Sequence, residues 1–243
     1  MRITHANQTI EFFTDSSLPS IPKHIGLSVS GGLDSASLLF LICKHYPQIK
    51  VSPMIGIDAY AKFDALCAFD IIEWMKDRFP NHNILDNQSF TFDHWDPYWI
   101  EKAQDLHDRG VATALQAEGT SKNLQMRNGL QTIKDEIKYE WHVTGTTANP
   151  PDDYMKKHGF YHKAEHVRDE PHNRKTFVRG LYTPYINVNK KFVAGVYKDN
   201  DLMDELYPYT SSCVGMPDTT DYGTVACGTC FWCHEKKWGF EDD

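Results

Sequence analysis

Six consecutive residues near the start of the chain have the composition of a phosphate-binding turn, Ser30-Gly31-Gly32-Leu33-Asp34-Ser35. They follow the apolar run 25–29 and precede the apolar run 36–41, an order that predicts a buried strand, a tight turn and a helix. Two adjacent glycines let the backbone approach a ligand with no Cβ in the way. The N–H groups that begin the following helix favour an anion, and the serines add hydroxyl donors. The segment therefore predicts a site for phosphate or pyrophosphate.

A second chemical group lies near the end of the chain, where Cys213 is followed by a C-x-x-C-x-x-C array, Cys227, Cys230 and Cys233. Four thiolates match the tetrahedral preference of structural zinc, and Gly228 permits the tight knuckle. An iron–sulfur cluster also takes four cysteines and stays as the alternative, although the Cys-Pro sequel of bacterial ferredoxins is missing. A closed four-cysteine zinc site has no open coordination position, so we expect it to pin the C-terminal tail rather than to catalyse.

Basic and histidine side chains between these two groups are further candidates. Lys190 and Lys191 are expected to contact phosphate or to be solvated at a helix start. Seven Lys or Arg residues between 155 and 180 indicate either a solvated insertion or a mobile lid over phosphates. The spacing of three histidines could bind a metal on one helix face, but exposed histidines are the commoner case: His158, His162 and His166.

The whole-chain composition limits the function classes. With 243 residues, 41% of them hydrophobic, the chain can form one core, or one core with a small lobe. A net charge of −8 argues against general nucleic-acid coating. We see no signal peptide and no apolar run long enough for a membrane span, and therefore expect a cytoplasmic protein with no membrane partner.

The elements that must position these residues alternate along the chain. Apolar runs predict strands at residues 9–14, 25–30, 51–57, 83–85 and 141–144. Helical patterns follow at residues 34–45, 61–79, 98–115 and 123–139. This order predicts an α/β fold, Rossmann-like, with a parallel sheet covered by helices on both faces. Because ligands of such sheets bind at the carboxyl ends of the strands, we expect Ser30, Asp58 and Gly145 to converge. We divide the chain into a nucleotide-binding domain (1–185, with a basic insertion at 146–180) and a helical C-terminal lobe (186–243).

The hexapeptide resembles the SGGxDS PP-loop of the ATP pyrophosphatase superfamily, whose members cleave ATP to AMP and pyrophosphate. No G-x-x-x-x-G-K-[ST] string occurs in the chain. Together with the cysteines, it resembles the 7-cyano-7-deazaguanine synthase family of the queuosine pathway. Residues 227–240 look like that family's CGxCxxCxxRxxAF ending, and residues 209–213 like its T-x-S-C. Residues 125–128 are similar to its GRN element, and residues 144–147 to its strand-end glycine loop.

The resemblance implies a Rossmann-like domain with a small zinc-bearing lobe. It implies adenylation of 7-carboxy-7-deazaguanine by ATP, followed by ammonia and a nitrile product. The cofactors implied are ATP, Mg²⁺ and Zn²⁺. The partners implied are a small-molecule carboxylate and ammonia, and a homodimer is left open. The catalytic residues it implies are Ser30, Asp34, Ser35 and Arg127, to which we add Lys190. The nucleotide-binding residues are Ser28, Ser30, Gly31, Gly32, Leu33, Asp34, Ser35, Asp58, Arg127, Asn128 and Gly145, and the zinc ligands are the four cysteines.

The chain departs from the family on the side of the deazaguanine. Residues 60–64 replace the family's Y-G-Q-R-H-like string, and Met126 replaces the glycine of GRN. Three alternatives remain: tRNA thiolation, attachment of a deazaguanine to a macromolecule, and a non-catalytic module that grips nucleic acid or protein. Thiolation would need a reactive thiol with a lowered pKa, at Cys43 or Cys67.

Overall fold

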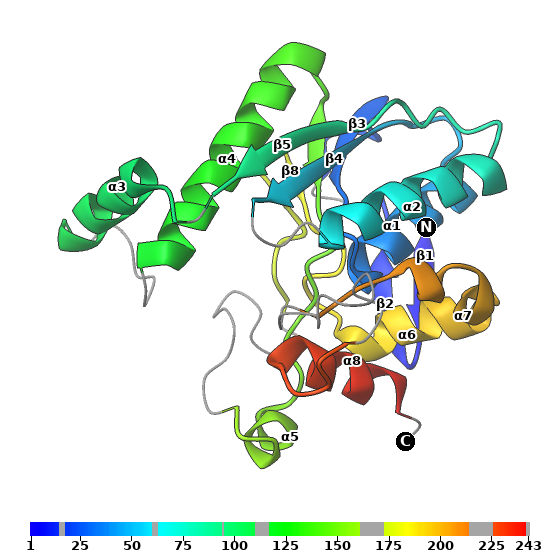
Figure 1. Cartoon of the computed structure of the whole chain (residues 1–243). Helices are drawn as coiled ribbons and strands as arrows, with labels where there is room; N and C mark the ends of the chain where they lie inside the picture. Colours follow the sequence, from blue (N-terminus) through cyan, green and yellow to red (C-terminus); the bar gives the residue numbers. More distant parts are fainter. Residues whose placement is uncertain are drawn as a thin grey trace.

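The computed structural model describes residues 1–14, 18–59, 63–93, 95–109, 117–160, 173–213 and 226–241. Its main sheet has six strands in the order β5-β4-β3-β6-β8-β7, of which only the edge strand β7 is antiparallel (Figure 1). The strands are β3 (His24–Ser28), β4 (Lys50–Asp58), β5 (Gln88–Phe92), β6 (Trp141–Val143), β7 (Phe177–Val178) and β8 (Leu181–Tyr182). A separate antiparallel hairpin joins β1 (Arg2–His5) to β2 (Gln8–Glu11).

Helices cover both faces of the sheet, as the alternating pattern predicts. Strand β4 shows this in two neighbouring residues: Ile55 belongs to the main core with α1 and α2, and Met54 packs with Ile133 of α4. The helices are α1 (Leu33–His45), α2 (Phe63–Arg78), α3 (Pro97–Asp108), α4 (Ala117–Ile137), α5 (Asp152–Lys157), α6 (Lys190–Asp199), α7 (Leu202–Glu205) and α8 (Phe231–Phe240), with a 3₁₀ turn at Tyr207–Tyr209. The α/β fold with a mostly parallel sheet is thus confirmed.

The apolar runs on either side of the glycine pair form the centre of the core. Ile25 and Leu27 of β3 are fully buried, as are Leu33 and Ala36 of α1. Burial of a strand on both faces is typical of parallel sheets and accounts for its continuous apolar sequence. The turn between β3 and α1 is therefore held at both ends by well-packed elements.

Some expected elements are misplaced. The strand expected at 83–85 is only an isolated bridge between Val51 and Ile84, and the strand itself is β5, at 88–92. Polar residues occupy alternate positions of β5, so the sequence shows no apolar run there. On the apolar side of the strand, Phe90 packs against α4. The strand expected at 9–14 is β2, which ends at Glu11 and pairs in the hairpin.

The helices and the basic insertion also differ in their bounds. The helix expected at 98–115 ends at Asp108, and the one expected at 123–139 begins at Ala117. Residues 177 and 178, expected within the basic insertion, form β7, and residues 181 and 182, just beyond it, form β8. Within the described ranges, no helix is both long and apolar enough to span a bilayer.

Candidate nucleotide site and cysteine cluster

The glycine-rich turn is closed by its own serine. The amide of Ser30 donates to Oγ of Ser35 at 3.1 Å, and that hydroxyl donates to the carbonyl of Gly32 at 3.1 Å. Gly31 has a φ of +77°, and a Cβ on it would lie 2.1 Å from the carbonyl oxygen of Asp64. Only glycine fits this backbone conformation and this close approach.

The first amides of α1 have no hydrogen-bond partner in the described part of the chain. The N–H groups concerned are those of Gly31, Gly32 and Leu33. Gly32 is the N-cap of α1 and has no side chain with which to satisfy them. N–H groups at a helix start carry partial positive charge and suit a phosphate oxygen.

Asp34 is the charged centre of the turn. Nζ of Lys190 donates to both oxygens of its carboxylate, at 2.6 and 2.7 Å. The hydroxyl of Thr147 donates to Oδ2 at 3.3 Å. On its other side, Nζ of Lys190 lies 3.4 Å from Oε2 of Glu235, in the C-terminal helix α8. Lys190, for which we left a solvated helix start open, is therefore almost wholly buried.

Besides the segment of Asp64, two other parts of the chain, at Gly145 and Ser211, form the walls of the turn. Gly145 follows β6, and a Cβ there would lie 2.8 Å from the carbonyl carbon of Asp34. The amide of Ser211, two residues before Cys213, donates to the carbonyl of Gly31 at 2.8 Å. Because Ser211 precedes the first cysteine so closely, the cysteine segment contacts the turn directly.

A second carboxylate lies beside the turn. Burial raises the pKa of Asp64 to about 6, a hydrogen bond from Ser211 acts in the opposite direction, and Asp58 adds a smaller rise. Asp58, at the end of β4, therefore lies close enough to Asp64 for its charge to act on that carboxyl. Asp64 was not among the predicted site residues, although it ends the segment 60–64 that replaces the family's Y-G-Q-R-H-like string.

Several predicted nucleotide-binding residues point elsewhere or make no contact with the turn. Oγ of Ser28 hydrogen-bonds Nε2 of His142 at 2.7 Å. Burial lowers the pKa of His142 to about 4, so its imidazole is neutral at pH 7. Arg127 and Asn128 are exposed on α4, and no described contact joins them to the turn. Leu33 is fully buried, so its side chain belongs to the core and cannot reach a ligand.

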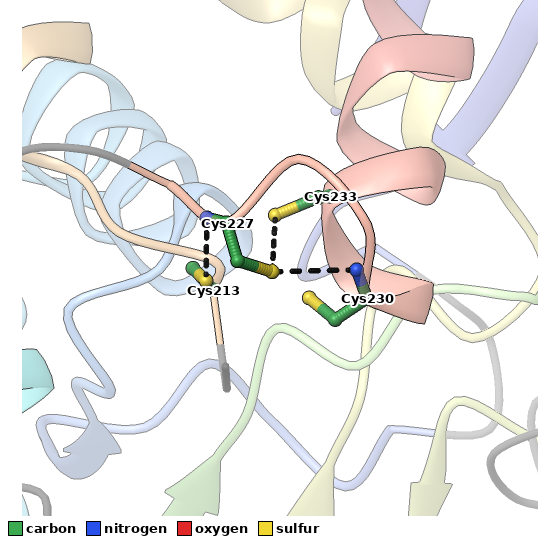
Figure 2. A group of neighbouring side chains, drawn as sticks. All are labelled: Cys213, Cys227, Cys230 and Cys233. Carbon is green, nitrogen blue, oxygen red and sulfur yellow. Dashed lines mark hydrogen bonds between the residues drawn. The ribbon is translucent and has the colours of Figure 1, made fainter. Parts of the chain in front are cut away.

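The four cysteines form one cluster (Figure 2). Their sulfur atoms all lie within 4.8 Å of one another, and Sγ of Cys227 and Sγ of Cys233 are 3.9 Å apart. A tetrahedral ion with bonds of about 2.3 Å separates its ligand atoms by about 3.8 Å, so the spacing fits one zinc ion. In a [4Fe–4S] cluster each cysteine binds a different iron, which spreads the sulfurs more widely. Hydrogen bonds from Thr229 and from the amide of Cys230 lower the pKa of Cys227 to about 6, whereas burial and the neighbouring cysteines raise that of Cys233 to about 12.

The two cysteines outside the cluster are buried. Burial raises the pKa of Cys43 to about 12 and that of Cys67 to about 11. Cys67 lies beside the turn, since a Cβ on Gly31 would be 3.0 Å from its Cβ. Its raised pKa makes it a poor nucleophile.

The histidine series is only partly described. The ring of His158 lies 4.4 Å from that of His234, between α5 and α8. His162 and His166 lie outside the described residues, as does most of the basic segment.

Comparison with known proteins leaves the family open. No family model matches the chain, and neither does any curated protein. Similar solved structures include NMN synthetase from Francisella tularensis (14% identity, TM-score 0.48, covering 95% of this chain and 83% of that one). The U34-tRNA thiolase NcsA from Methanococcus maripaludis, with its [4Fe-4S] cluster, is 12% identical (TM-score 0.48), over 78% of this chain and 61% of that one. The NH3-dependent NAD synthetase from Campylobacter jejuni is 14% identical (TM-score 0.43), over 79% and 71% of the two chains. These likenesses do not establish what this chain binds.

Proposed function

We propose that the chain is an ATP-dependent ligase that activates a carboxylate as its adenylate and releases pyrophosphate. The observation that carries the proposal is the glycine turn at Ser30–Ser35, with its unpaired amides in the described residues and the ion pair between Asp34 and the buried Lys190. The amides and Lys190 are suited to the negative charge that builds up on departing pyrophosphate. Asp34, the partly exposed carboxylate of the turn, would bind the Mg²⁺ that accompanies ATP and screens its phosphates.

The substrate that we propose is 7-carboxy-7-deazaguanine, on the resemblance of the turn and the cysteine array to the synthase family. A carboxylate oxygen attacks the α-phosphorus of ATP, and pyrophosphate leaves. Ammonia then attacks the acyl carbon, and AMP and a proton leave to give the amide. A second ATP activates the amide oxygen with release of a second pyrophosphate, and loss of AMP and a proton then yields the nitrile. No side-chain nucleophile is needed, because the substrate supplies the attacking oxygen.

Zinc is the metal that we propose for the cysteine cluster, because one tetrahedral ion fits the 3.9 Å separation of two of the sulfurs. When bound, zinc would supply a structural cross-link between residue 213 and helix α8. Cys213, Cys227, Cys230 and Cys233 would all be ligands, which leaves no position for a substrate.

tRNA thiolation is the second candidate, and the position of Cys67 beside Gly31 favours it. A thiol at that place could in principle carry sulfur to an adenylated base. Burial and the neighbouring Asp64 raise the pKa of Cys67 to about 11, however, so that the thiol stays protonated at neutral pH. The ligase therefore explains the turn better.

The test measures pyrophosphate release and products by mass spectrometry, from ATP, ammonia and 7-carboxy-7-deazaguanine. We expect release by the wild type, and none by Asp34→Ala or Ser30→Ala. Asp70→Ala is the matched control, because Asp70 is exposed on α2. Normal release by both turn variants would refute the assignment, and sulfur transfer without a nitrile would favour thiolation.

A further inference from the structure

One ammonium group joins carboxylates from the two ends of the chain. Nζ of Lys190 lies 2.6 Å from Asp34 and 3.4 Å from Glu235. Lys190 begins α6, Asp34 lies in the first turn of α1, and Glu235 lies in α8. The cluster therefore connects the nucleotide turn to the helix that carries Cys233.

The three side chains differ in how far a ligand can reach them. The side chain of Asp34 is 23% exposed, against 4% for Lys190 and 2% for Glu235. A cation that arrives with ATP thus meets Asp34 and cannot reach Glu235. Both oxygens of Asp34 are already bonded to Lys190, so the incoming cation and the ammonium compete for the same atoms.

Lys190 needs another anion if it gives up Asp34. A buried ammonium without a partner is strongly unfavourable. Burial lowers the pKa of Lys236, and the charge of Lys190 lowers it further. Lys190 therefore also has a second positive charge nearby. Glu235 is the carboxylate already within reach, and the flexible stem of a lysine allows the small shift.

The position of Glu235 depends on the cysteine cluster. Glu235 follows Cys233 by two residues in α8, whose N-cap is Cys230. The same helix packs on the lysine stem, since a Cβ on Gly239 would lie 2.4 Å from Cγ of Lys190. Whatever holds the cysteines together therefore also holds Glu235 against Lys190.

We propose that Glu235 is a positioning residue for nucleotide binding, which takes over Lys190 when the magnesium complex of ATP engages Asp34. The proposal rests on the proposed function for the identity of the ligand, ATP. It adds that the C-terminal helix α8 takes part in the nucleotide site through Lys190, although α8 carries no nucleotide-binding motif. Lys190 exchanges one carboxylate for the other, and no bond or proton is transferred.

Titration calorimetry of Glu235→Gln tests the exchange, with ATP titrated in excess Mg²⁺ and again in excess EDTA. The loss of the second carboxylate leaves Lys190 on Asp34, so we expect about tenfold weaker binding of Mg·ATP, a change of about 1.4 kcal/mol. Binding of metal-free ATP should stay within about twofold, because Asp34 then keeps Lys190 in both proteins. A purely structural loss would weaken both alike and would overturn the proposal, as would unchanged affinity in both.

Glu241→Gln is the matched control, because Glu241 caps the same helix and pairs with Lys237 on the surface at 3.9 Å. Its affinities should equal those of the wild type. Thermal unfolding and metal content of each variant show whether α8 is still folded.

A second measurement needs no variant. In a crystal structure of the wild type with Mg²⁺ and a non-hydrolysable ATP analogue, we expect Nζ of Lys190 nearer to Glu235 than to Asp34. A lysine still within about 3 Å of both Asp34 oxygens would overturn the proposal. If the wild type binds Mg·ATP but makes no nitrile, the deazaguanine assignment fails while this binding result stands.

Discussion

The glycine turn and the cysteine cluster maintain their shapes in different ways. The turn lies between β3 and α1, whose Leu27 and Leu33 are fully buried. The cluster has an exposed Cys227 and is joined within the described residues by weak contacts to sulfur, such as the amide of Cys227 on Sγ of Cys213 at 3.2 Å. The apolar core is therefore sufficient to form the turn, whereas we expect the cluster to become rigid only when it binds a metal ion.

Removal of the metal should have the largest effect. That effect should be confined to the cysteine cluster and α8. Structural zinc contributes on the order of 10 kcal/mol in small zinc domains, so chelation should speed amide exchange in α8 by more than about a hundredfold. Exchange in β3 and α1 should not change. Hydrogen exchange with mass spectrometry measures both regions in one sample.

The matched variants for this experiment are Cys230→Ser, which should lose the metal, and Cys43→Ser, which should keep it. Cys43 is buried in α1, outside the cluster. Equal exchange in α8 with and without the metal would remove the contrast between the two regions.

Substitution of Gly31 should affect the turn and leave the cluster intact. Gly31→Ala combines a φ of +77° with a Cβ that would lie 2.1 Å from the carbonyl oxygen of Asp64. We expect a loss of about 4 kcal/mol in the free energy of unfolding, from backbone strain and overpacking together. Urea unfolding measures the loss, and metal content should stay at that of the wild type.

Gly159 offers a control with the same strain and no clash, because its φ is +86° and nothing lies within 4 Å of a Cβ there. Gly159→Ala should cost only about 1 kcal/mol. Equal losses for the two variants would show that the approach of Asp64 does not constrain the turn.

The pH dependence of stability tests the packing beneath the turn, and we expect the smallest effect there. Burial lowers the pKa of His142 to about 4, and the unfolded imidazole has a pKa of 6.5. The unfolded state therefore binds a proton first, and stability that is present above pH 6.5 is lost as the pH falls towards 4. The shift corresponds to roughly 3 kcal/mol, at about 1.4 kcal/mol per pKa unit.

His142→Gln should lose correspondingly less stability between pH 7 and pH 4, measured by urea unfolding at each pH. His24, His45 and His82 also have lowered pKa values from burial, but they remain in both proteins and cancel in the difference. An identical pH profile for the two proteins would contradict the buried, neutral state of His142.

Much of the fold could be predicted from local patterns. The apolar runs around Gly31 predicted β3 and α1 within two residues at each end, because both elements bury nearly every side chain. The strand β5 was missed, since only Phe90 and Phe92 mark it among polar residues, and its pairing with β4 decides its place. The short strands β7 and β8 have only two residues each, too few to show a period.

The candidate site divides in the same way. By itself the sequence determined the turn and the spacing of the last three cysteines, because these depend on neighbouring residues and on the backbone freedom of glycine. Only the tertiary structure decided that Lys190 lies on Asp34, 156 residues away, and that Glu235 lies behind it. Such pairs leave no local pattern, because their energy comes from the low dielectric of a core that exists only once the distant helices have packed.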